Sequence, residues 1–326
     1  MNIKKTVSLF LSAVMLSFSL LSCGKKNSES VMKIAGYDVP MDIYRCIVIT
    51  TRKNIENEYG DDVWNSSSAE KATSELQEGI RNNLIELYTV CALGADCGIT
   101  PDDGYIQSQM TITKQDYIDE LGGKNEFKEE LKNTHMSEAA FEFILTNSIM
   151  IDEIYDHVAH SDEKYEDVDY LREVFAGDEF IRVKQILIGG EYSADEEKDL
   201  EKAQEIYSKL KNGADFDKLS QDYNNDLLMF SNDDGYYITR GSRDRAFEEA
   251  AFALDVGEIS EIVKTDAGYS IIKRYEKSDE YIDTHLNELA NEYYEALYTS
   301  LYEEKREEVT ASADELPKSI DIMTLD

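Results

Sequence analysis

The spacing of apolar and polar residues is most regular between Phe180 and Lys277, where it predicts a compact unit of strands and helices. An apolar run at 181–188 ends on a Gly-Gly pair and is typical of a strand. Apolar residues at helical spacing follow over 200–210, and another helix is predicted around 247–254. Three more strands are predicted at 236–239, 261–265 and 269–275. A unit of about a hundred residues can bury a core of its own.

Amphipathic helices are predicted on both sides of this unit. Those before it cover 41–59, the stretch from the capping pair Ser67 and Glu70 to Gly98, a stretch that begins at Pro101, and 137–157. After it, an apolar stripe runs from Ile282 to Leu301 and requires a partner surface. From Glu303 onward the chain is acidic, and we expect its end to fray.

The first residues are typical of a secretory signal, with two lysines followed by an apolar run from Val7 to Leu21. Cys23 follows the run almost directly, which predicts a lipoprotein whose mature chain begins at a lipidated Cys23. A signal anchor and a simple cleaved signal are the alternatives. The polar residues up to Ser30 would form a tether. We therefore expect the chain to be anchored by lipid at the extracytoplasmic face of the cell membrane.

The formal net charge of −35 argues against nucleic acid as a partner, because phosphate binding needs clustered cations. An acidic surface could attract cationic unfolded chains or divalent cations, but a solubilising surface is the simpler interpretation. The 42% of hydrophobic residues is enough to fill cores, which excludes a disordered acidic tail.

Three cysteines remain when Cys23 is set aside, and an odd number does not make a disulfide framework. Cys91 and Cys97 could pair, or they and Cys46 could be buried thiols; the apolar helix face that carries Cys91 favours thiols. The spacing of cysteines and histidines predicts no metal site and no cofactor.

Four segments in order resemble parvulin-type peptidyl-prolyl cis-trans isomerase domains: VKQILI, NGADFDKLSQDY, GYYITRG and AFEEAAFALDVGEISEIVKTDAGYSIIK. The resemblance covers 181–274. The start of the chain body, with two short strands, a proline and a helix, is similar to the N-terminal regions of secreted foldases of the PrsA and SurA types.

This resemblance implies an α+β fold, in which a parvulin-like domain with a small, mainly antiparallel sheet and flanking helices is inserted in or appended to an all-α domain of the SurA N-terminal type. The implied parts are a signal peptide (1–22), a lipidated tether (23–30), a helical chaperone domain (31–178), a parvulin-like domain (179–277), a helix that returns to the helical domain (278–310) and an acidic tail (311–326).

The resemblance also assigns site residues. The polar positions are Asp226, Gln185, Ser270 and Thr265, and the proline socket falls on Phe247, Ile238 and Arg243. Gln185 and Ser270 stand where the family has two histidines, and Arg243 stands where it has a socket methionine. We expect Gln185 and Ser270 to hydrogen-bond each other or Asp226, and Arg243 to block the socket or to pair with an acid such as Asp226. Phe247 could equally be plain core.

The implied function is that of a membrane-anchored foldase, which isomerises X-Pro bonds in unfolded or partly folded secreted proteins with weakened activity. The alternative is a holdase chaperone, in which the helical domain holds extended clients and the parvulin unit is a degenerate scaffold.

Overall fold

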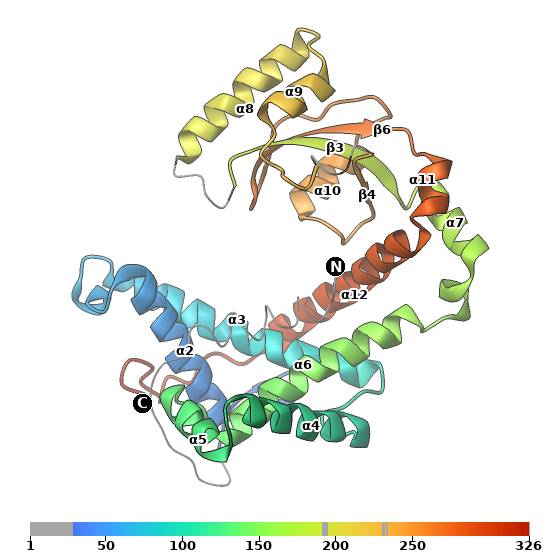
Figure 1. Cartoon of the computed structure of the whole chain (residues 1–326). Coiled ribbons are helices and arrows are strands. Elements are labelled where there is room, and N and C mark those ends of the chain that lie inside the picture. The colour runs from blue at the N-terminus through green and yellow to red at the C-terminus, as the bar shows by residue number, and fades with distance from the viewer. Residues whose placement is uncertain (1–28, 191–194, 230–231, 233, 326) are drawn as a thin grey trace. The chain divides into compact units, whose positions relative to one another are not determined.

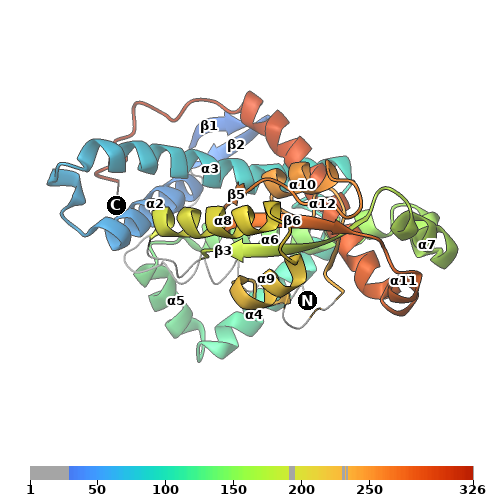
Figure 2. The same ribbon diagram turned by 90° about the horizontal axis from the view of Figure 1, so that it is seen from above.

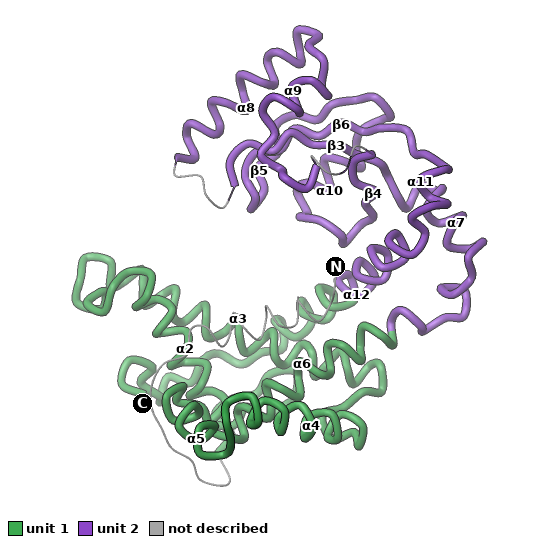
Figure 3. The backbone as a smooth tube through the Cα atoms, viewed as in Figure 1, with its two compact units in different colours: residues 1–157, 301–326 green, residues 158–300 purple. Residues whose placement is uncertain are grey.

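The computed structural model describes residues 29–190, 195–229, 232 and 234–325. The chain divides into two compact units, shown in Figure 3. Unit 1 contains the described residues up to His157 together with those from Leu301 onward, and unit 2 runs from Val158 to Ser300. The C-terminal residues thus belong to the same unit as the N-terminal ones.

Unit 1 begins with a hairpin of β1 (Ser30–Ile34) and β2 (Tyr37–Pro40), turned at Gly36, whose φ of 81° favours glycine. Its helices are α2 (Met41–Tyr59), α3 (Ala69–Asp96), α4 (Gly104–Glu120), α5 (Lys124–Asn133) and α6 (Glu138–Ala159), with a 3₁₀ turn η1 at Val63–Asn65. Large, fully buried core side chains from α2 and α3 include Tyr44, Leu76, Ile80, Leu84 and Ile85.

Helix α4 begins three residues later than the sequence predicts. Asp103, not Pro101, precedes its first turn, and an Asp103 Oδ1 accepts from the backbone N–H of Tyr105 over 2.8 Å. The expected pair of Ser67 and Glu70 likewise does not cap α3, whose N-cap Ser68 makes no side-chain bond. Ser137, by contrast, caps α6 as expected, since its hydroxyl accepts from the Ala140 N–H over 2.9 Å.

The prediction that the chain frays after Glu303 is wrong. Helix α12 (Leu286–Ser312) continues through that stretch, and Asp314 then exchanges hydrogen bonds with the backbone of Lys33. Although this stretch is acidic, it also contains apolar side chains that pack against the core of unit 1: Ala313, Leu316, Ile320, Ile322, Met323 and Leu325.

Unit 2 is built around an antiparallel sheet in the order β4-β3-β6-β5, and Figure 2 shows β3 and β6 side by side. The strands are β3 (Ile181–Ile188), β4 (Tyr236–Ile238), β5 (Val263–Thr265) and β6 (Gly268–Tyr275). Helices α8 (Glu196–Lys211) and α9 (Phe216–Tyr223) cover one face, and α10 (Arg245–Phe252) covers the other (Figure 1).

A second core of unit 2 joins the helices around the sheet. Phe175 from α7 (Val168–Ala176) packs edge-on against Phe180, with the ring centroids 4.9 Å apart, and Tyr293 from α12 packs on both rings. Helix α11 (Asp279–Thr284) adds Ile282, and the 3₁₀ turn η2 (Glu163–Glu166) precedes α7. These contacts extend the compact unit beyond 179–277, the range predicted for the parvulin-like part.

The predicted fold class is confirmed: the described residues are mostly helical, and the four-stranded antiparallel sheet of unit 2 has helices on both faces. Cys46, Cys91 and Cys97 are free thiols, of which the first two are buried. Burial raises the pKa of Cys46 and of Cys91 to about 12. Within the described residues, no helix is long and apolar enough to cross a membrane.

Candidate functional site

The register of the central strand pair sets the candidate site. Leu187 of β3 stands directly opposite Ser270 of β6, so Gln185, two residues from Leu187, shares a sheet face with Ser270. The Ser270 hydroxyl donates to Gln185 Oε1 over 2.9 Å. Ser270 is fully buried at 1% exposure, so this bond satisfies a hydroxyl that water does not reach. The expected contact between the two residues is therefore present.

Asp226 closes the same network from the loop that follows α9. Its Oδ2 accepts from Gln185 Nε2 over 2.7 Å and from the Tyr236 hydroxyl over 2.8 Å. Its Oδ1 accepts from the backbone N–H of Leu228 over 3.1 Å. Both carboxylate oxygens are thus engaged by neighbours of the chain itself.

Asn224 fixes this loop to the sheet. Its side-chain oxygen accepts from the N–H groups of Leu187 over 2.8 Å and of Asp226 over 3.1 Å, while its Nδ2 donates to the carbonyl of Gln185 over 3.0 Å. One buried amide therefore bonds both the strand and the loop that carries Asp226. The sequence marks this stretch only as a polar loop.

Tyr236 was also missed from the sequence. It pairs with Val183 in the β3·β4 ladder, and Val183 lies two residues from Gln185 on the same face. Burial raises the pKa of the Tyr236 hydroxyl, and the adjacent Asp226 carboxylate raises it further, so the hydroxyl stays a donor. The signal that could have found it is strand alternation, which places residue 236 on the face of residue 238.

The apolar part of the site lies beside this network. Ile238 and Phe247 are buried, at 0% and 5% exposure, in one cluster with Ile181, Val183, Ala251, Leu254 and Ile272. Ile238 pairs with Ile181 and thus shares the face of Tyr236. The packing of Phe247 is that of a core residue, and it forms an apolar floor next to the polar groups.

The expectation that Arg243 pairs with Asp226 is wrong, because its acidic partner is Glu292. Its guanidinium donates from Nη1 to Glu292 of α12 and to the carbonyl of Ser242, each over 2.7 Å. It lies 5.3 Å from the centroid of the Tyr236 ring, a cation–π distance. Glu292 was not foreseen, because it lies 49 residues away in a helix whose position the sequence does not give.

Thr265 lies on the same sheet face as Ser270, since it is two residues from Val263, the partner of Ser270. Its hydroxyl donates to the carbonyl of Gly268 over 3.3 Å. This bond lies within the β5–β6 hairpin, and among the described residues no hydrogen bond links Thr265 to the Asp226 network. Its immediate role is thus to close the hairpin.

In the described part of the site, hydrogen-bonding side chains lie beside an apolar floor and no activated nucleophile is present. Among the described residues, no group of three or more His, Cys, Asp or Glu side chains is placed to hold a metal ion. Cys23, the predicted lipidation site, lies outside the described residues.

Comparison with known proteins identifies the unit around this site. The family model for the PPIC-type PPIase domain, also called rotamase, matches residues 180–276. The foldase protein PrsA of Caldanaerobacter subterraneus subsp. tengcongensis is 25% identical over 278 residues, which covers 83% of this chain and 82% of that protein. The PrsA of Geobacillus kaustophilus is 46% identical over 81 residues, which covers 24% of this chain and 29% of that protein.

A crystal structure of the PrsA peptidylprolyl isomerase from Bacillus anthracis is 24% identical and covers 69% of this chain and 96% of that one, with a TM-score of 0.37. The family match and the aligned relatives confirm the predicted resemblance to parvulin-type isomerases and to foldases of the PrsA type.

Proposed function

We propose that this chain, whose residues 180–276 belong to the PPIC-type PPIase family, is a membrane-anchored foldase that isomerises X-Pro bonds in unfolded secreted proteins at the extracytoplasmic face. One observation supports the proposal most: the Asp226 network and the apolar cluster of Phe247 share one face of the sheet inside the matched region. Such a pair of surfaces suits an X-Pro segment, which has a polar amide beside an apolar ring.

The chemistry required is modest. The barrier to rotation about the peptide bond is about 18–20 kcal/mol and comes from amide resonance, so no covalent intermediate is needed. The enzyme must bind the twisted amide more tightly than either planar form. In our proposal the apolar floor holds the proline ring, and Gln185, Ser270 and Asp226 provide the hydrogen-bonding groups near the amide.

We further propose that the activity is weakened. Gln185 and Ser270 replace the two histidines that the family resemblance implies, and each is engaged by the other or by Asp226. A network whose members already satisfy one another must break a hydrogen bond before it meets a substrate amide. The engaged state of Asp226 supports the same view, since both of its oxygens accept bonds within the loop and the strands.

A holdase without isomerase activity is the second candidate, and the same self-satisfied network favours it. In this case the polar residues would serve only the shape of the domain. The clients and the extracytoplasmic location would be the same. The isomerase and the holdase therefore differ only in the rate at which X-Pro bonds isomerise.

The isomerase test uses the full-length chain in detergent and a tetrapeptide with an X-Pro bond, with exchange followed by NMR. We expect exchange faster than in buffer alone. Exchange at the rate of the buffer would remove the enzymatic role. Suppressed aggregation of an unfolded protein by the same sample would then support the holdase, and no suppression would exclude it as well.

The anchor is tested by replacing the proposed lipidation site. Cys23→Ser should move the chain from the membrane fraction to the soluble fraction of the cells that express it, whereas Cys46→Ser, a change of a buried thiol, should leave it in the membrane fraction. Equal partition of both variants would contradict lipid anchoring through Cys23.

A further inference from the structure

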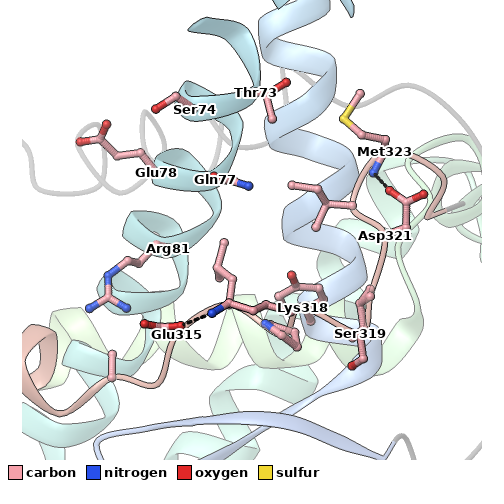
Figure 4. A pocket seen from close by; sticks show the side chains of 16 residues that line it. Thr73, Ser74, Gln77, Glu78, Arg81, Glu315, Lys318, Ser319, Asp321 and Met323 are labelled. Carbon is pink, nitrogen blue, oxygen red and sulfur yellow. Dashed lines mark hydrogen bonds and ion pairs between the residues drawn. The ribbon is translucent and has the colours of Figure 1, made fainter. Parts of the chain in front are cut away.

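Unit 1 contains a groove that is separate from the candidate isomerase site of unit 2. Residues 313–323, which we call the strap, form neither helix nor strand and border a groove of about 990 Å³. Figure 4 shows strap residues between Glu315 and Met323 on one side and side chains of α3 on the other. The α3 side chains that line the groove are Thr73, Ser74, Gln77, Glu78 and Arg81.

Two arginines hold the strap near its ends, and both bind main-chain carbonyls. Arg81 of α3 donates to the carbonyls of Asp314 over 3.0 Å and Thr310 over 3.1 Å. Arg52 of α2 donates from Nη1 to the carbonyl of Met323 over 2.9 Å. These contacts therefore hold the strap through its backbone and not through its side chains.

The surface beside the arginines accepts apolar side chains. Leu316, Ile320, Ile322 and Met323 of the strap pack against the hydrophobic core of unit 1 and remain partly buried there. The strap thus shows, within the chain itself, that this part of unit 1 binds an irregular polypeptide segment through carbonyls and apolar side chains.

Tyr44 of α2 gives a second, independent observation that points to a ligand in the groove. It lines the groove, its exposed fraction is 0%, and within the described part of the chain its hydroxyl has no hydrogen-bond partner. A buried hydroxyl without a partner costs about 1–3 kcal/mol. An acceptor that enters the groove, such as a main-chain carbonyl, would remove this penalty.

We propose that this groove binds an extended apolar segment of an unfolded polypeptide, and that the strap must shift to admit it. The inference rests on the proposed role with unfolded clients and names where unit 1 takes hold of them. It does not depend on isomerase activity. The incoming segment would lie against α2 and α3, with a carbonyl on the Tyr44 hydroxyl and apolar side chains on the surface that the strap now covers.

The charges of the groove argue against an anionic small molecule as the occupant. The two basic groups of the lining are already engaged, since Arg81 binds carbonyls and Lys318 pairs with Glu315 over 2.9 Å. Glu78 and Asp321 add negative charge. A neutral backbone with apolar side chains fits this lining better than a phosphate or a carboxylate does.

The test measures binding of a fluorescein-labelled peptide that copies residues 313–326 to the full-length chain, by fluorescence anisotropy. Arg52→Met frees one end of the strap and should tighten binding by about fivefold or more. The reason is that the conformation in which the strap has left the groove, and the peptide can enter, becomes more populated. Arg45→Met, the loss of another α2 arginine, should leave affinity unchanged. The peptide is acidic, so the loss of an arginine would weaken its binding if charge alone decided the affinity. Tighter binding to Arg52→Met therefore cannot come from the change in charge.

Tyr44→Phe in the Arg52→Met background should weaken peptide binding by about threefold or more, the loss of one hydrogen bond, with no fall in the unfolding midpoint, since it removes an unsatisfied group. Tyr88→Phe is the matched control. The Tyr88 hydroxyl donates to the carbonyl of Asp38 over 3.3 Å, so this variant should lose stability and keep its affinity.

If Arg52→Met does not fold, Asp314→Ala frees the other end of the strap by removing a 2.9 Å bond from Lys33 N–H.

Equal affinities in the parent chain, Arg52→Met and Asp314→Ala would overturn the proposal. So would tight binding that Tyr44→Phe leaves unchanged, because the peptide would then lie elsewhere. Formation of dimers by Arg52→Met in sedimentation would assign the groove to the strap of a second copy. Isomerase rates on the tetrapeptide should be the same in all variants, so a failure here is distinct from a failure of the isomerase proposal.

Discussion

Gln185 donates a hydrogen bond from its side-chain amide to Asp226 over 2.7 Å, and this bond, together with those of Asn224, connects the central strand to the loop after α9. It makes the polar site part of the fold of unit 2, since the strand and the loop are 41 residues apart. A change at Asp226 therefore acts on stability and on the proposed catalysis together.

Asp226→Ala removes the acceptor for three donors. We expect a loss of about 1–3 kcal/mol in the free energy of unfolding, because the half-buried Gln185 amide and Tyr236 hydroxyl lose their acceptor. We also expect the isomerase rate to fall by about tenfold or more. Urea unfolding and NMR exchange measure the two effects. Asp222→Ala, at an exposed position of α9, should change neither. A variant with normal rate and lower stability would make Asp226 a purely structural residue.

The Arg243–Glu292 ion pair predicts that Glu292 influences the isomerase rate, although it lies outside residues 180–276, which the family model matches. Glu292→Gln frees the guanidinium, which can then turn toward the Asp226 carboxylate near Tyr236. We expect the isomerase rate to fall by about two- to fivefold, in line with a pair energy of up to about 1 kcal/mol. Arg243→Met should restore the rate in the Glu292→Gln background. A drop that persists in the double variant would mean that Glu292 acts without Arg243.

Tyr236 predicts a dependence of stability on alkaline pH. Burial and the Asp226 carboxylate raise the pKa of its hydroxyl above the unfolded value of about 10. A raised pKa gives stability that is complete below pH of about 10 and is lost as the pH rises through the folded value. The difference in unfolding free energy between the parent chain and Tyr236→Phe should therefore shrink above pH of about 10. A constant difference from pH 8 to pH 11 would contradict this assignment.

The thiols predict a pattern of chemical labelling. Burial raises the pKa of Cys46 and Cys91 to about 12, so little thiolate exists at neutral pH and reagents have little access. Iodoacetamide at pH 7.5 should leave both unmodified in the native chain and label both in urea, as peptide mass spectrometry measures. Native labelling of Cys91 that matches that of the half-buried Cys97 would argue against a closed core around α3.

Strand alternation, helical spacing and the family resemblance were sufficient for the elements of unit 2 and for the Gln185–Ser270 contact. Tyr236 and Asn224 escaped notice because their roles depend on which strand lies beside which, and β4 is only three residues long. Glu292 escaped notice because the pairing of a loop arginine with a distant helix has no local pattern. The end of the chain was misjudged for a different reason: its charges are evident in the sequence, whereas the burial of Leu316 and Ile320 depends on the surface they meet.

The antiparallel pairing of β3 and β6 also bears on how such a domain can be carried by other proteins. Arg182, near the start of the matched region, stands opposite Tyr275, near its end. Paired residues of this kind have Cα atoms about 4.5–5.5 Å apart, so the chain enters and leaves the domain at almost one point. A host protein could accept the whole domain in a surface turn without opening its own core. The helices on either side of the domain therefore need to provide only one attachment point for both of its ends.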